Sequence, residues 1–385
     1  MADYLTSQIS TIVNDAVKDA LGKSNSITNI DTSSFVSLGK ALEDYDLLDG
    51  WFGALTRRIA KTVYFVRSYQ PRTRSILRDE HEYEAFVQKV YYDMPNAVDD
   101  PTWGIPNSSG TYAQASPYDV ETTVTVNAKI FGGKGAWSIE IVRPLQQIKD
   151  AFISASDMAS FIDGIYTVIE NSYKLEEERL VALACNTAMA SALKGGKSRN
   201  LLSEYNTAHP TATLTVAECL ESADFLKYAS KEINDTIDNM ENMSTAFNKA
   251  GYETFTSRDN LVVEMLGKFA SASDMYLQAD TFHNTLTALP KFEKVSFWQN
   301  SGKTFSFADC STISVSNDAI DEHPVVQSGI ICFLHDYENV AAHFGSRRTW
   351  EMVNPRSEVA IHGEHADKGF AVENHANAVV FYVAV

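Results

Sequence analysis

The sequence predicts an α+β fold, and three patterns in its 385 residues carry that prediction. From Val120 to Ile130 apolar and polar residues alternate, which is typical of a strand with one buried face. From about Ser156 to Leu193 the apolar residues follow helical spacing, which predicts a helix roughly 55 Å long. Residues 201–327 then alternate between shorter helix and strand patterns, as in a separate inserted unit. A lone hairpin and a long helix cannot bury their apolar faces, so we expect neighbouring copies to cover them.

The N-terminal region begins with two helical patterns, at residues 4–21 and 35–51, which are separated by a polar spacer. A basic segment follows at residues 57–78, which holds seven Lys or Arg residues and no acid. This segment is either a solvated basic face or an arm that pairs with an acidic surface of a neighbouring copy. The second interpretation is the more specific one, because electrostatic complementarity fixes register and partner choice.

Residues 79–130 predict a long β-hairpin. A strand pattern at Ala85–Tyr92 is followed by a segment rich in Pro and Gly, and the strand that ends at Ile130 returns along it. The alternative is a β-subdomain that folds back on its own core. The Gly-rich segment at Gly132–Trp137 predicts a bulge or turn before a second strand at Ser138–Val142.

The long helix has clear start and stop signals. Ser154 or Ser156 can cap its N-terminus, and Asp157 in the first turn favours the helix dipole. Gly195 or Gly196 can adopt the left-handed conformation that ends it.

The C-terminal half predicts alternating elements. We expect helices at 215–231, 238–249 and 280–286, and strands at 260–264, 295–298, 312–315, 329–335, 340–345, 349–355, 358–364 and 377–385.

Composition excludes several classes of protein. The net charge of −18 argues against a nucleic-acid reader, which would carry a basic surface. No apolar run reaches the ~18 residues of a membrane span, and the first residues lack the pattern of a secretory signal. The four cysteines are scattered without a CxxC pair, so we expect neither a disulfide framework nor a zinc site.

The sequence predicts no catalytic residue, no cofactor and no metal site. The segment KGGKS at residues 194–198 lacks the first Gly of a phosphate-binding loop and follows a helix. His362, His365 and His375 are the best metal candidates, but a spacing of three places the first two on opposite faces of a strand. A metal-dependent intracellular hydrolase that uses these histidines remains a remote alternative.

Several segments, in order, resemble a known family. They are RIAKTVYFVR (58–67), EYEAFVQKVYYDMPNA (82–97), the stretch from Trp137 to Leu183, MVNPRSEV (352–359) and HANAVVFYVAV (375–385). Together they resemble tailed-bacteriophage major capsid proteins of the Hong Kong 97-like (HK97-like) fold, closest to those of Bacillus podoviruses. The resemblance covers the chain from about Arg58 to its C-terminus and is weakest at residues 201–327.

The resemblance implies a domain organisation. It assigns 1–66 to an N-terminal arm, 67–136 to an extended loop, 137–200 to a peripheral domain with the spine helix, 201–328 to an axial domain, and 329–385 to closing strands of the peripheral domain. Some relatives carry an immunoglobulin-like domain after these strands, and we expect no surface decoration of that kind here.

The resemblance also implies a structural, non-enzymatic function in the virion capsid. Hexamers and pentamers of the chain would close an icosahedral shell around double-stranded DNA, after assembly in the host bacterial cytoplasm. We expect a separate scaffolding protein, a portal protein, no membrane partner and no proteolytic removal of the N-terminus. An encapsulin-type bacterial nanocompartment shell is the alternative within the same fold. The expected inter-subunit contacts are Arg57, Arg58, Arg67, Arg72, Arg74, Arg78, Tyr91, Tyr92 and Trp103.

Overall fold

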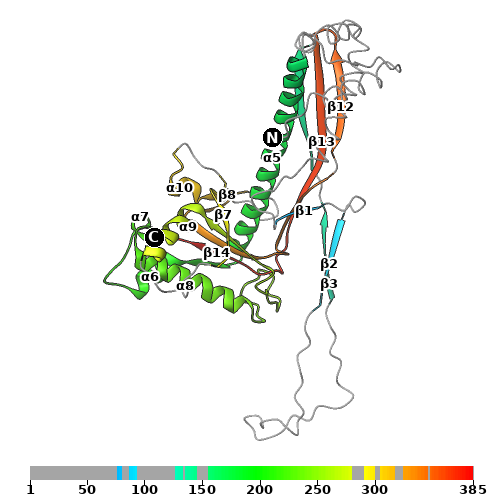
Figure 1. Cartoon of the computed structure of the whole chain (residues 1–385). Coiled ribbons are helices and arrows are strands. Elements are labelled where there is room, and N and C mark those ends of the chain that lie inside the picture. The colour runs from blue at the N-terminus through cyan, green and yellow to red at the C-terminus, as the bar shows by residue number, and fades with distance from the viewer. Residues whose placement is uncertain are drawn as a thin grey trace, which may run out of the picture. The chain divides into compact units, whose positions relative to one another are not determined.

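The structure is a computed structural model, and its helices and strands are labelled in Figure 1. It describes residues 76–79, 86–92, 126–132, 135–144, 155–279, 290–299, 304–316, 324–345 and 347–384. The chain forms two compact units, each built from three segments. The first comprises 1–82, 134–183 and 342–370, and the second comprises 83–133, 184–341 and 371–385.

The first unit contains a five-stranded sheet. Its strands are β1 (Leu77–Asp79), β4 (Gly135–Pro144), β11 (Val340–Phe344), β12 (Arg348–Asn354) and β13 (Val359–Val372). β13 pairs antiparallel with β12 and with β4, while β1 pairs parallel with β11. The long helix α5 (Ala155–Lys194) runs beside this sheet (Figure 1). Trp137, Tyr173 and Ala366 form a core cluster between helix and sheet, and Phe344 packs against them. Ala360, His362, Glu364 and Ala366 of β13 are buried at alternate positions, so they share one face of the strand, and Ala366 places that face against the helix.

One position of this sheet, Gly363, has no room for a side chain. The Trp350 ring lies over Gly363, where an added Cβ would come within 2.2 Å of the indole. On the opposite face, the Arg347 guanidinium lies 3.4 Å from the centre of the Tyr173 ring. Its nearest carboxylates are Glu170 at 3.7 Å and Glu364 at 3.9 Å. One face of the sheet therefore carries the Trp350–Gly363 contact, and the other carries Arg347 with an aromatic ring and two carboxylates.

Helix α5 confirms the predicted long helix and its ending. Gly196 has a φ of +68°, which is the left-handed conformation. The Gly196 amide donates to the Leu193 carbonyl at 3.0 Å, and the Lys197 amide donates to the Ala192 carbonyl at 2.8 Å. These two bonds form a Schellman motif, which satisfies carbonyls that would otherwise be left open at the helix end.

The second unit contains another five-stranded sheet, in the order β5 (Ser198–Asn200), β14 (Ala378–Tyr382), β10 (Ile330–Asp336), β6 (Leu261–Leu266) and β7 (Glu293–Val295). All seven residues of the central strand β10 are buried. The elements around it are α6 (Leu201–Ala208), α7 (Val216–Cys219), α8 (Ala223–Met240), α9 (Gly267–Ala279), α10 (Phe307–Cys310) and the pair β8 (Ile313–Val315) and β9 (Val325–Gln327). Its largest fully buried side chains are Phe225, Phe269, Phe333 and Phe381.

Three predicted elements need correction. The helix expected at 215–231 is two helices, because Glu218 completes a capping box with Thr215 and Ser222 caps the next helix. The prediction of a helix at 238–249 is wrong. Instead α8 ends at Met240 and Ser244 forms a β-bridge with Thr254. The strand expected at 295–298 is β7, at 293–295, because the Trp298 ring turns inward and donates to the Ile330 carbonyl.

Strands at 260–264, 312–315, 329–335, 340–345 and 349–355 are confirmed within two residues by β6, β8, β10, β11 and β12. β13 and β14 confirm the last two strands, although β13 continues to Val372. The patterns at 4–21, 35–51 and 280–286 lie outside the described residues.

The two compact units cut across the ranges of the predicted domains. Within residues 329–385, β10 and β14 lie inside the sheet of the second unit, and β12 and β13 lie in the sheet of the first. β10 pairs with β6 along one edge and with β14 along the other, so its backbone hydrogen bonds are satisfied on both sides. The range 137–200 likewise divides after Leu183. The expected arm, 1–66, lies outside the described residues.

Candidate functional site

The most unusual feature of the described chain is a two-stranded hairpin in the second unit (Figure 1). β2 (Phe86–Tyr92) pairs antiparallel with β3 (Val126–Gly132), which confirms the predicted hairpin. Tyr92 pairs with Val126 and Val90 pairs with Ala128. Paired residues point to the same side of a sheet, so this register gives the hairpin two chemically different faces.

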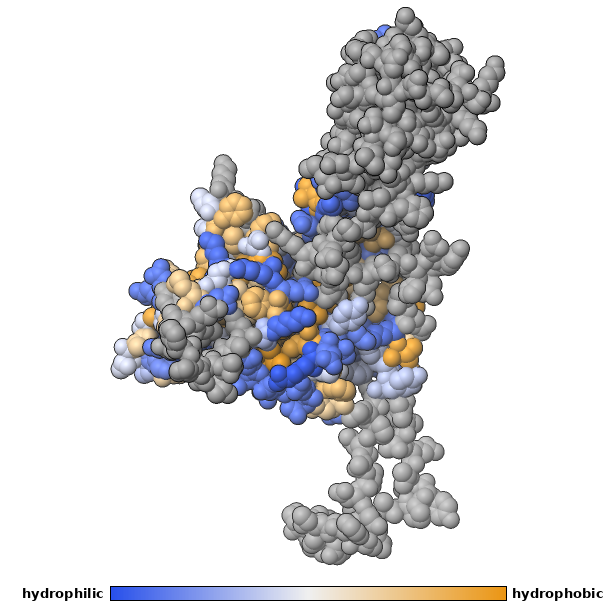
Figure 2. Space-filling model, viewed as in Figure 1, coloured by the Kyte–Doolittle hydropathy of each residue, from blue (hydrophilic) through white to orange (hydrophobic). Residues whose placement is uncertain are grey.

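One face of the hairpin is apolar and exposed. Relative exposure is 68% for Tyr92, 65% for Ile130, 55% for Val126 and 42% for Val90, and Ala128 is exposed as well. On the face that Figure 2 shows, hydrophobic and hydrophilic residues are interspersed over the described part of the chain. An apolar face on two paired strands is the kind of surface that marks a protein contact. The sequence predicted a buried apolar face for this strand, and this subunit alone does not bury it.

The opposite face of the hairpin is polar and binds the rest of the second unit. The Lys89 ammonium pairs with the Glu338 carboxylate, and the Asn127 amide donates to the Tyr252 hydroxyl. The Lys129 ammonium donates to the Val372 carbonyl at 3.3 Å. These contacts hold both strands of the hairpin by their polar side.

Glu373 lies at the centre of this anchor and is only 3% exposed. Its carboxylate accepts hydrogen bonds from the Tyr91 hydroxyl and, at 3.0 Å, from the His375 amide. The imidazole Nδ1 of His375 lies 2.7 Å from the same carboxylate, and the Lys129 ammonium lies 3.7 Å away. The Tyr91 ring stacks on the His375 ring with centroids 3.8 Å apart, and Tyr252 meets the His375 ring edge-on at 4.6 Å.

The backbone around Glu373 is fixed independently of the hairpin. The Glu373 amide donates to the Asn339 carbonyl at 2.7 Å, and the Asn339 side-chain amide donates to the Glu373 carbonyl at 2.7 Å. Asn339 follows the central strand β10, and Glu373 follows β13 and precedes β14. The sheet of the second unit therefore positions the carboxylate.

Electrostatics favour the charged form of this carboxylate. Burial opposes its ionisation, but the hydrogen bonds from Tyr91 and His375 and the Lys129 charge outweigh burial and hold the pKa of Glu373 below its usual value. Burial, and then the bond to Glu373, raise the pKa of Tyr91 well above its usual value. The anchor is thus a carboxylate that accepts from a neutral phenol.

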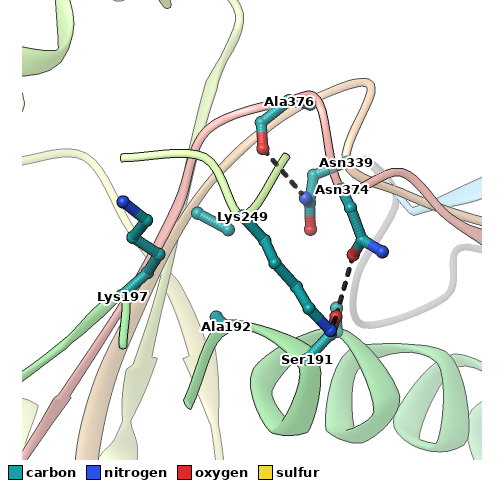
Figure 3. A pocket seen from close by; sticks show the side chains of 9 residues that line it. Ser191, Ala192, Lys197, Lys249, Asn339, Asn374 and Ala376 are labelled. Atoms are coloured by element: carbon teal, nitrogen blue, oxygen red, sulfur yellow. Dashed lines mark hydrogen bonds between the residues drawn. The ribbon is translucent and has the colours of Figure 1, made fainter. Parts of the chain in front are cut away.

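A small pocket lined by alanines and polar side chains lies beside the anchor (Figure 3). The Lys249 ammonium donates to the Ser191 hydroxyl at 3.1 Å, and that hydroxyl donates to the Asn374 side-chain oxygen at 2.8 Å. The cavity volume is about 10 Å³, which is room for about one water molecule. Small-molecule sites are far larger, so this pocket is not a substrate site.

The predicted contact residues have mixed positions. Tyr92 is exposed on the apolar face, whereas Tyr91 points to the anchor within the subunit. Arg78 belongs to β1. The others, Arg57, Arg58, Arg67, Arg72, Arg74 and Trp103, lie outside the described residues.

Sequence reasoning missed Glu373 and Lys129. The two residues are far apart in the chain, and no local pattern joins them. Alternation in β3 places Lys129 opposite the apolar face, but it does not identify the partner.

The three histidines that were considered for a metal have separate environments. His362 is buried in β13, with Glu351 and Glu364 each 3.9 Å from a ring nitrogen. His365 is exposed and stacks on Trp350, and His375 belongs to the anchor. Within the described ranges no group of three or more His, Cys, Asp or Glu residues is arranged to hold a metal ion. No described helix is long and apolar enough to cross a membrane.

Comparison with known proteins gives one family and a set of similar folds. The family model of Phi29-like phage major capsid proteins matches residues 13–382. No curated protein sequence matches the chain. The chain is similar to one in the capsid structure of Staphylococcus phage Andhra, with 11% identity, a TM-score of 0.52 and coverage of 80% of this chain and 83% of that one. It is also similar to a chain in the structure of the head fibre and inner core protein gp22 of native bacteriophage P68, with 12% identity, a TM-score of 0.54 and coverage of 83% and 86%.

Proposed function

The chain belongs to the family of Phi29-like phage major capsid proteins, and we propose that the apolar face of its β2–β3 hairpin is a surface through which one subunit joins the next. Its role in the virion is structural, and its fold is the HK97-like fold that the resemblance implied. Neither the nanocompartment nor the hydrolase alternative receives support from the family or from the described residues.

The exposed apolar face carries this proposal. Tyr92, Val126 and Ile130 are each more than half exposed on two paired strands. Covering an aliphatic side chain of this size contributes about 1.5–3 kcal/mol, so a neighbour that covers the face gains substantially. The polar face is already engaged with its own subunit, and therefore only the apolar face is free to bind another copy.

The larger assembly follows from this role. Subunits join as hexamers and pentamers and close an icosahedral head around double-stranded DNA, in the host bacterial cytoplasm and with a separate scaffolding protein and a portal protein. The chain itself performs no chemical step. Its net charge of −18 suits a container, because a wall that neutralised many phosphates would bind the genome tightly.

The extended loop, the peripheral and axial domains and the basic arm complete the proposal. Arg57, Arg58, Arg67, Arg72, Arg74 and Arg78 would pair with acidic surface on a neighbour. Trp103, in the segment between β2 and β3, would add an aromatic contact.

The test is electron microscopy of the chain expressed with its candidate scaffolding protein. We expect closed particles from the native chain and at least about tenfold fewer from Ile130→Lys, because a buried interface charge costs more than 1.4 kcal/mol. Val326→Lys is the matched control, since Val326 is 62% exposed and lies outside the hairpin. It should leave the particle yield within about twofold.

A deletion of residues 96–116 tests the same proposal differently. We expect a folded subunit that does not close shells, with circular dichroism as the control for folding. Normal yields of closed particles from both Ile130→Lys and the deletion would contradict the proposal.

A further inference from the structure

We propose that Glu373 is the positioning residue of the hairpin: its carboxylate binds both strands at once and holds the polar face against the second unit, so that the apolar face is presented to another copy. The inference rests on the proposed function of the apolar face. The inference names Glu373 as the residue that orients the apolar face away from its own subunit.

Glu373 is the one described carboxylate that contacts both strands of the hairpin. It accepts from the Tyr91 hydroxyl of β2, and the Lys129 ammonium of β3 lies 3.7 Å away. Tyr91 and Lys129 occupy the same face of the hairpin, one register step either side of the Val90–Ala128 pair. A single buried carboxylate therefore contacts both strands of the hairpin, by a charge-assisted hydrogen bond to β2 and by an ion pair to β3.

Residues outside the hairpin also hold Glu373 in place. Two hydrogen bonds of 2.7 Å join Glu373 to Asn339, one between backbone groups and one from the Asn339 side chain to the Glu373 carbonyl. The His375 amide and imidazole bind the carboxylate from the opposite end of the same turn. A preorganised acceptor loses little conformational freedom on binding, which makes it suited to positioning.

The other hairpin contacts are weaker candidates for this role. Lys89 and Glu338 form an ion pair whose side chains are 34% and 59% exposed, and water screens such pairs strongly. Asn127 and Tyr252 form a neutral hydrogen bond on exposed side chains. Loss of the Glu373 contact should therefore free the hairpin more than loss of the Lys89 contact.

Hydrogen–deuterium exchange of the unassembled subunit measures the anchor without any assembly. Glu373→Gln keeps the side-chain shape and removes the charge. We expect the amides of 86–92 and 126–132 to exchange about tenfold faster in this variant, while those of the central strand β10 keep their rates. Tyr91→Phe, which removes only the hydroxyl, should give a smaller increase. Glu338→Gln removes the exposed ion pair with Lys89 and is the comparison variant; it should raise the hairpin rates by no more than about twofold.

A pH profile separates positioning from general structural support. The pKa of Glu373 is lowered from a usual value of 4.5, so its contacts are complete above that pH and are lost as pH falls further. Hairpin exchange, corrected for the intrinsic chemical rate, should accelerate in acid in the native chain and in Glu338→Gln, but not in Glu373→Gln. The other titratable groups at the anchor are Tyr91, Lys129, His375, Tyr252, Lys89 and Glu338.

The outcomes are distinct. Equal hairpin exchange in native, Glu373→Gln and Glu338→Gln chains would overturn the inference, and so would an acid step of the same size in Glu373→Gln. Faster exchange in Glu373→Gln with unchanged particle yield would retain Glu373 as the anchor and would instead contradict the proposed function of the apolar face.

Discussion

The central strand β10 and the hairpin β2–β3 are both β-structure with apolar residues, yet they end in opposite environments. β10 is buried along its whole length, because β6 and β14 pair with it on both sides and helices cover the sheet. The hairpin has one partner strand for each strand, and its apolar residues remain exposed. The difference shows that burial depends on what packs against a strand, and that an unpacked apolar strand is available for a partner chain.

The two regions also differ in the pKa of a buried carboxylate, which is raised for Glu264 and lowered for Glu373. Glu264 in β6 is fully buried, and burial followed by repulsion from Glu293 raises its pKa to about 8. The Cys185 thiol donates to its carboxylate at 3.6 Å, and a thiol is a weak donor. Glu373 at the hairpin is also buried but is ionised, because strong donors surround it. The sheet core keeps a neutral acid, while the anchor keeps a charged one.

The largest expected effect on stability comes from a substitution in the buried strand β10. Phe333→Ala removes a side chain that is 0% exposed in β10, and we expect a loss of about 3–5 kcal/mol in the free energy of unfolding. Urea unfolding of the unassembled subunit measures it. A loss below about 1 kcal/mol would show that β10 is not the centre of a packed core.

A second effect, spread over several pH units, is expected from the neutral acid Glu264. The folded chain holds the Glu264 proton at pH values where the unfolded chain releases it, so stability falls as pH rises from about 4.5 towards about 8. The slope contributed by this group is at most about 1.4 kcal/mol per pH unit. Glu264→Gln removes the ionisation and should flatten the profile in this window, as followed by urea unfolding at a series of pH values. A slope that persists unchanged in the variant would assign it to other groups.

The smallest effect on stability is expected at the hairpin. Tyr92→Ala removes a side chain that is 68% exposed, so the free energy of unfolding should change by less than about 0.5 kcal/mol. The yield of closed particles should nevertheless fall, because the aromatic side chain is lost from the proposed contact. Sedimentation of assembly reactions measures the yield. A large loss of subunit stability would instead mean that Tyr92 is part of the core.

Local patterns predicted the elements whose signals lie within a few neighbouring residues. The apolar spacing of α5, the glycine that ends it and the alternation of β3 all depend on short-range geometry, and the structure contains them. The prediction of a helix at 238–249 failed because the apolar spacing did not account for a competing local interaction. The side chain of Asn248 exchanges hydrogen bonds with the backbone of Tyr252, which competes with helical bonding.

The sequence by itself determined the long helix, the hairpin, the α+β class and the family resemblance, because periodicity and ordered segments are local properties. Only the tertiary structure decided that β10 and β14 belong to the second unit's sheet and that Glu373 binds the hairpin. The same holds for the exposure of the apolar face of β3. These features depend on strand partners and on contacts between residues as much as 282 positions apart, which no local pattern encodes.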